Sequence, residues 1–187
     1  YLRTKNIIIP PKRDSHKEKT YTGAHVKDPI AGMHKWVVSF DLNSLYPHLI
    51  MQYNISPETI LTGQRINGTV DQFLNKEVNT KEMHELDVCL AASGQVFRRD
   101  LQGFLPEMME QRYNNRTVYK KKMIQAQQKL QKETDPKKRF ELEKEISQNH
   151  NLQLAMKISM NSAYGALGNQ YFRFYDERLA EAITLGG

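Results

Sequence analysis

The sequence contains little cysteine and no long hydrophobic run. Its 187 residues include one cysteine, Cys89, which excludes an internal disulfide and a zinc site built from several cysteines. The longest apolar runs, residues 7–10 and 36–40, are as long as strands and fall well short of the roughly 18 residues of a membrane span. The first residues lack the apolar run of a signal peptide, so a cytosolic protein is the default expectation.

The composition is that of a folded chain. Hydrophobic residues make up 39% and aromatic residues 9%, which is too apolar for a disordered segment. A chain of this length can bury roughly 70% of its unfolded surface, enough for one domain or two small ones.

The formal net charge of +6 is unevenly distributed. Residues 112–157 carry 12 basic and 5 acidic side chains, a net +7, and residues 1–40 carry a net +5. Residues 41–111 lie between them with a net −5, and residues 158–187 carry −1. This pattern fits a site in which carboxylates hold metal ions while basic segments hold phosphates.

The first half of the chain predicts strands and short helices. Residues 35–41, KWVVSFD, are rich in β-branched and aromatic side chains and predict a strand. Pro47 cannot continue a strand but suits the first turn of a helix, so a helix is expected to begin near it. Residues 62–100 mix glycines with alternating polarity and predict short strands and turns.

The second half predicts two long helices. After Pro106 no glycine or proline interrupts the chain until Asp135 and Pro136, which supply an N-cap and a first-turn proline for a second helix that runs to Gly165. Because the connection is short, the two helices are expected to form an antiparallel hairpin. A further helix is expected from Glu177 onward.

The segment SFDLNSLYPHLI, residues 39–50, places a carboxylate at the end of the predicted strand. Asp41 would point its oxygens out of the sheet, where a divalent cation can bind. The amides of Asn43, Ser44 and Leu45 in the turn could receive phosphate oxygens in a backbone nest. The residues alone fit equally well an aspartate that caps a strand before a Tyr-Pro turn.

Two helical stripes carry further candidate ligands. Lys157, Asn161 and Tyr164 share one helix face, which suits a triphosphate and a stacked base or sugar. Arg112 and Arg116 are spaced i, i+4, with Lys120 one turn further, and two guanidinium groups suit phosphate oxygens. Taken singly, an ordinary mixed surface and a solvated basic face are the more common explanations of these stripes.

These segments together resemble a known family. SFDLNSLYP resembles motif A of the B-family (α-like) DNA-directed DNA polymerases, and KISMNSAYG, residues 157–165, resembles their motif B. YTGA, residues 21–24, resembles a short element that precedes motif A. NISPETI, residues 54–60, and residues 162–176 look closest to the replicative polymerases of T-even-type bacteriophages, including those of cyanobacteria.

The resemblance implies roles for the motif A residues. Asp41 would bind metal together with the main-chain carbonyl of Leu42. Ser44 and the amide of Leu45 would receive the triphosphate. Tyr46 would lie under the deoxyribose and exclude a 2′-hydroxyl.

It also implies roles for three basic residues. Arg112 and Lys157 would bind the incoming triphosphate when the helical hairpin closes. Arg116 would bind it too, at a position where many relatives have lysine. Asp41 and Lys157 are the residues that the resemblance implies are catalytic.

The remaining implied positions contact nucleotide or DNA. Asn161 would support the nucleotide pocket, while Tyr164 and Gly165 would pack on the nascent base pair. Tyr21 and Gly23 would contact the template.

The fold class implied by the resemblance is α+β, a partial polymerase palm of strands and helices with an inserted antiparallel helical hairpin, the fingers. Residues 1–35 would be a linking segment, residues 36–105 the palm portion with motif A, residues 106–165 the fingers with motif B, and residues 166–187 a truncated return to the palm.

The implied function is template-directed DNA synthesis, in which dNTPs are added to a primer 3′-hydroxyl with two Mg²⁺ ions. The implied partners are primer–template DNA, dNTP and, through parts of the enzyme outside this sequence, a sliding clamp, with no membrane. A virus-encoded enzyme would work in the cytoplasm of its host cell.

The sequence departs from the family at two points. His48 stands where many relatives have serine, and no role is assigned to it. The Asp-x-Asp motif that supplies the second metal-binding aspartate occurs nowhere in the 187 residues. The chain is therefore expected to be a fragment that is inactive on its own.

Two other functions remain open at this point. A non-catalytic nucleic-acid-binding module would use the basic hairpin to dock on phosphates, and it would be indifferent to dNTP. An RNA-directed or protein-primed polymerase would share the chemistry but would fit the NISPETI segment poorly.

Overall fold

The computed structural model describes residues 2–11 and 23–187, and within them the chain combines helices with one small sheet, an α+β arrangement. The first half contributes α1 (Leu45–Gln52), α2 (Val70–Leu74), α3 (Lys81–Glu85), β1 (Val88–Leu90) and β2 (Val96–Arg98). The second half contributes α4 (Phe104–Lys132), α5 (Pro136–Leu167) and α6 (Glu177–Gly186). None of the helices in these ranges is long and apolar enough to cross a membrane.

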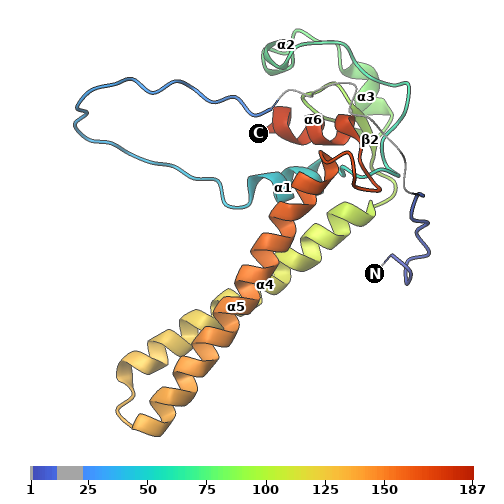
Figure 1. The fold of residues 1–187 in the computed structure, drawn as a ribbon. Coiled ribbons are helices and arrows are strands. Elements are labelled where there is room, and N and C mark those ends of the chain that lie inside the picture. Colours follow the sequence, from blue (N-terminus) through green and yellow to red (C-terminus); the bar gives the residue numbers. More distant parts are fainter. Residues whose placement is uncertain (1, 12–22) are drawn as a thin grey trace.

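Helices α4 and α5 form the long antiparallel hairpin that the sequence predicts (Figure 1). Asp135 is the N-cap of α5, and its Oδ1 accepts a hydrogen bond from the Lys137 amide at 2.9 Å. Arg139 Nη1 donates to the carbonyls of Leu130 and Glu133 and so satisfies acceptors at the end of α4. The turn is therefore specified by two side chains at the start of α5, one that caps α5 itself and one that binds the end of α4.

The hydrophobic core lies at one end of this hairpin, where α1 and α6 pack against it (Figure 1). It draws fully buried side chains from α1, the segment that follows α1, β2, both long helices and α6, which are Ile50, Ile55, Phe97, Met109, Met160, Leu167, Leu179 and Ile183. The hairpin is thus anchored at its base.

Residues 54–59, the NISPET segment, hold the first turn of α4. Asn54 Oδ1 accepts a hydrogen bond from the Gly103 amide at 2.9 Å, Glu58 Oε1 accepts one from the Phe104 amide, and Ser56 Oγ accepts one from Leu105. A Cβ at position 103 would lie 2.5 Å from the Ser56 Cβ, so this close approach requires glycine. The segment therefore supplies the side-chain caps that α4 lacks locally.

The prediction of a strand over residues 35–41 is wrong for the described chain. Residues 23–42 form an extended loop that leaves the packed base and returns to α1 (Figure 1), with Trp36 97% and Phe40 92% exposed. The φ angle of 61° at Trp36 also interrupts an extended backbone. A strand needs a partner for its N–H and C=O groups, and the described residues place none beside this segment.

Residues 62–100 contain the predicted strands and turns, together with two short helices. Strands β1 and β2 pair antiparallel, with Cys89 opposite Phe97. Gly94, with φ 80°, turns the chain between them, and a Cβ there would lie 2.0 Å from the Ile66 carbonyl oxygen. Helices α2 and α3 are the elements that the sequence did not predict.

Candidate functional site

A sharp turn joins Asp41 to helix α1. Ser44 is the N-cap of α1 and adopts a left-handed conformation, with φ 57° and ψ 43°. For a residue with a Cβ this conformation costs roughly 1–2 kcal/mol, so the surrounding contacts must hold it in place. The turn leaves the first amides of α1 at the edge of a cavity.

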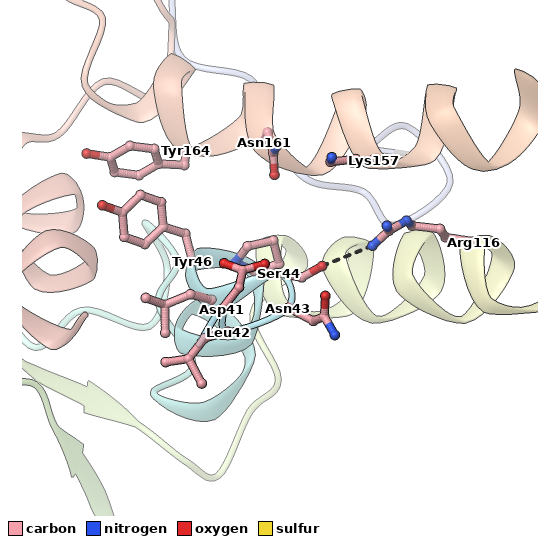
Figure 2. A pocket seen from close by; sticks show the side chains of 11 residues that line it. Asp41, Leu42, Asn43, Ser44, Tyr46, Arg116, Lys157, Asn161 and Tyr164 are labelled. Atoms are coloured by element: carbon pink, nitrogen blue, oxygen red, sulfur yellow. Dashed lines mark hydrogen bonds between the residues drawn. The ribbon is translucent and has the colours of Figure 1, made fainter. Parts of the chain in front are cut away.

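That cavity, of about 420 Å³, lies between the turn and the helical hairpin (Figure 2). One side is the turn and the start of α1, and the other comes from α4 and α5. Its lining residues are Asp41, Leu42, Asn43, Ser44, Leu45, Tyr46, Pro47, Arg116, Lys157, Asn161 and Tyr164. Residues far apart in the sequence therefore form one site.

Positive groups face the cavity from both helices of the hairpin. Arg116 on α4 donates from Nη1 to the Ser44 hydroxyl oxygen at 3.2 Å. The Nε of the same guanidinium is buried and has no hydrogen-bond partner among the described residues. Lys157 on α5 is exposed, as is Asp41 on the turn. The cavity thus combines two cations and the positive end of a helix with one carboxylate, a set suited to phosphates and a divalent cation.

Two tyrosines meet at the other end of the cavity. The rings of Tyr46 on α1 and Tyr164 on α5 have centroids 4.5 Å apart at an interplanar angle of 43°. Figure 2 shows the two rings one above the other, with Asn161 and Lys157 further along α5. This end offers flat apolar surfaces, which suit a sugar or a base.

Of the residues that the motifs imply and the structure describes, three do not line this cavity. Arg112 donates from Nη1 to the Met156 sulfur at 3.7 Å, and Gly165 is exposed on α5 with open space around it. Gly23 lines a second cavity, of about 860 Å³, that also includes Leu45 and Tyr46. Tyr21 lies outside the described residues.

Two lining residues, Asn43 and Pro47, are not among those to which the resemblance to the polymerases assigns a role. The sequence predicts a phosphate contact only for the amide of Asn43, and for Pro47 it predicts only a place in the first turn of a helix. Their position inside the motif A segment is the signal that points to them.

The comparisons with known proteins cover the whole chain. The family model of DNA polymerase family B matches residues 1–187. The chain belongs to DNA polymerase family B. This confirms the resemblance that motifs A and B carried in the sequence.

Family B relatives occur in phages and archaea. The DNA-directed DNA polymerase of Escherichia phage RB69 is 33% identical over 224 aligned positions, which cover 100% of this chain and 24% of the relative. The DNA-directed DNA polymerase of Enterobacteria phage T4 is 29% identical, over 100% of this chain and 24% of the relative. DNA polymerase 1 of Pyrococcus abyssi is 29% identical over 98% of this chain and 20% of its own.

A solved family B polymerase has a similar fold. The structure from the hyperthermophilic archaeon Pyrobaculum calidifontis gives a TM-score of 0.57 at 24% identity, over 97% of this chain and 20% of that chain. The chain thus spans about a quarter or less of the length of these polymerases.

Within the part of the chain that the structure describes, side chains do not gather into a complete set of metal ligands. Among the described residues no group of three or more His, Cys, Asp or Glu side chains lies close enough to hold a metal ion. The cavity offers the Asp41 carboxylate and neighbouring main-chain oxygens. Mg²⁺ commonly binds to one or two carboxylates together with water and substrate phosphates, so these donors fit part of a Mg²⁺ site.

Proposed function

We propose that this chain is part of a template-directed DNA polymerase and that its cavity binds the incoming dNTP. One observation carries the proposal: the cavity joins the motif A turn, with Asp41, to Arg116 on α4 and Lys157 on α5. Family B membership supplies the reaction class. The phage relatives support a place of action in the cytoplasm of an infected host cell.

In this proposal the α4–α5 hairpin corresponds to the fingers, over about residues 106–165. Residues 36–105 and 166–187 belong to the palm, and residues 1–35 form a linking segment. The packing of α1 and α6 against the base of the hairpin supports this division.

The triphosphate lies against the cations and the start of α1. Arg116 and Lys157 neutralise its charge, and the amides of Ser44 and Leu45 donate to its oxygens. The Ser44 hydroxyl accepts from Arg116, which leaves its own proton available for a phosphate oxygen. Arg112 joins when the hairpin closes, because its present partner, a thioether, is a weak acceptor that is easily exchanged.

The sugar and base lie toward the tyrosine end of the cavity. Tyr46 packs under the deoxyribose and excludes a 2′-hydroxyl, while Tyr164 supports it from α5. Asn161 supports the nucleotide from the same helix, and Gly165 lies near the nascent base pair. Template DNA would pass the cavity that Gly23 lines. The proposed template contact of Tyr21 falls outside the described residues.

Asp41 and the Leu42 carbonyl would hold Mg²⁺. The two ions of this reaction class stabilise the charge on the attacking and leaving oxygens. Asp41 would supply one carboxylate at the turn. The second aspartate ligand, which the family's Asp-x-Asp motif supplies and which is absent from these 187 residues, would come from another part of the polymerase. We therefore expect no primer extension by the 187 residues alone. Binding of a sliding clamp through other parts of the enzyme stays a prediction.

Lys157→Gln in the full-length polymerase tests the nucleotide site. Loss of one charge-assisted contact to a phosphate corresponds to about 1.5–3 kcal/mol, so the apparent Kd for dNTP in single-turnover extension should rise on the order of 10- to 100-fold. Lys144→Gln, which removes the same charge from an exposed position on the same helix, is the control and should leave it unchanged. An unchanged Kd in Lys157→Gln, or an equal rise in both variants, would contradict the proposed site.

A further inference from the structure

His48 lies one helical turn after Ser44 and makes two hydrogen bonds to its carbonyl. The backbone amide of His48 donates at 3.1 Å, as in any helix, and the ring Nδ1 lies 2.8 Å from the same oxygen. A carbonyl oxygen only accepts hydrogen bonds, so Nδ1 must carry the proton. The ring therefore ties the side of α1 back to the turn that precedes it.

The same ring contacts the helical hairpin. His48 and Tyr113 on α4 have ring centroids 4.7 Å apart at 81°, an edge-to-face arrangement. Both side chains are half-buried, and His48 does not line the dNTP cavity. His48 thus links α1 to α4 without being part of the cavity lining.

Ser44 is held on two sides by these contacts. Its hydroxyl accepts from Arg116, and its carbonyl accepts from His48. The left-handed conformation of Ser44 costs roughly 1–2 kcal/mol, and a net hydrogen bond contributes about 0.5–1.5 kcal/mol. The His48 bond is therefore of the right size to decide whether Ser44 keeps this conformation.

We propose that His48 is a positioning residue that holds Ser44 in its left-handed conformation and so fixes the turn that receives the triphosphate. This inference rests on the proposed dNTP site. His48 acts through Ser44 and does not touch the nucleotide. The hydrogen bond from Nδ1 carries this role, while the ring contact with Tyr113 sets where the ring lies.

Two variants of the full-length polymerase distinguish the effect of the Nδ1 hydrogen bond from the effect of the ring contact with Tyr113. His48→Phe keeps a ring against Tyr113 but removes the donor. His48→Asn removes the ring but keeps a donor of suitable reach, because Asn149 Nδ2 in this same chain donates to the Glu145 carbonyl, four residues earlier, at 2.9 Å. Single-turnover extension gives the Kd for dNTP and the maximal rate separately.

We expect His48→Phe to raise the Kd for dNTP about fivefold, as the loss of one hydrogen bond implies, with a smaller effect on the maximal rate. His48→Asn should restore the Kd to within about twofold of the parent protein. His150→Phe, at an exposed histidine on α5, is the control and should change neither quantity.

Two results would overturn the inference: an unchanged Kd in His48→Phe, or a Kd in His48→Asn that is raised as much as in His48→Phe. The second result would indicate that ring packing alone matters. If Lys157→Gln raises the Kd while His48→Phe does not, this inference fails and the dNTP site stands. If neither variant changes the Kd, the proposed site fails as well.

Discussion

Two short segments on either side of α1 are held in opposite ways. Residues 41–44 form a turn whose first residues are exposed and whose Ser44 has a left-handed backbone. Residues 54–59 are largely buried, and three of their side chains bind the first amides of α4. The turn places its polar groups at the cavity. The polar side chains of residues 54–59 instead form hydrogen bonds within the fold.

This difference predicts that substitutions in the turn change activity, whereas substitutions in residues 54–59 change stability. A polar group that faces a ligand is unpaired or weakly paired without it, so its removal changes binding or rate more than folding. A buried polar group with internal partners behaves in the opposite way, because its removal leaves those partners unsatisfied. The two segments should therefore respond differently to substitution.

The largest effect is expected at Asp41. Asp41→Ala in the full-length polymerase should lower primer extension by a factor on the order of 10³ or more, because the metal ions lose a ligand at the reacting phosphate. DNA binding and the melting temperature should hardly change, since Asp41 is exposed.

Asp28→Ala, in the same exposed loop, is the control and should extend primers normally. Retained extension by Asp41→Ala would remove the metal assignment. A large fall in the melting temperature of Asp41→Ala would contradict the claim that the turn contributes little to stability.

Asn54→Ala should instead destabilise the base of the hairpin. The Asn54 amide donates to the carbonyls of Arg98 and Leu101 at 2.6 and 2.7 Å and accepts from Gly103. Leaving these buried groups unpaired is expected to cost about 2–4 kcal/mol. Hydrogen exchange at residues 103–105 should accelerate on the order of 10²-fold in the variant.

The matched control is Asn151→Ala, at an exposed position on α5, where exchange at residues 103–105 should be unchanged. Equal exchange in Asn54→Ala and the parent protein would mean that residues 54–59 do not hold α4.

The smallest of these effects concerns sugar selection at Tyr46. Tyr46→Ala should increase ribonucleotide incorporation relative to deoxyribonucleotide by at least about tenfold, because it removes the ring that blocks a 2′-hydroxyl. Tyr46→Phe keeps the ring and should remain selective. Competition between rNTP and dNTP on one template measures the ratio, and unchanged selectivity in Tyr46→Ala would argue against the gate.

Local signals made the hairpin predictable. The absence of glycine and proline after Pro106, and the pair Asp135 and Pro136, specify two helices and their turn within a few residues. The second helix extends to Leu167, two residues past the predicted end at Gly165, because glycine is tolerated within a helix whose neighbours pack.

Other features of the fold depend on interactions between distant residues, so the local sequence does not predict them. The strand predicted over residues 35–41 depends on a partner that local sequence cannot supply. The caps on α4 join residues 46 to 49 positions apart, so no local pattern reveals them. The motif resemblance names most of the residues that line the cavity. Its expectation that Arg112 binds the triphosphate when the hairpin closes stays a prediction, since the guanidinium here lies against Met156.

The central claim is that the motif A turn and the cations of α4 and α5 form one dNTP site. A structure of the full-length polymerase with primer–template DNA, a non-hydrolysable dNTP and Mg²⁺ tests it most directly. The account predicts triphosphate oxygens within hydrogen-bonding distance of Arg116 and Lys157, and Asp41 bound to a metal ion. A triphosphate bound away from both cations, with Asp41 facing solvent, would contradict it.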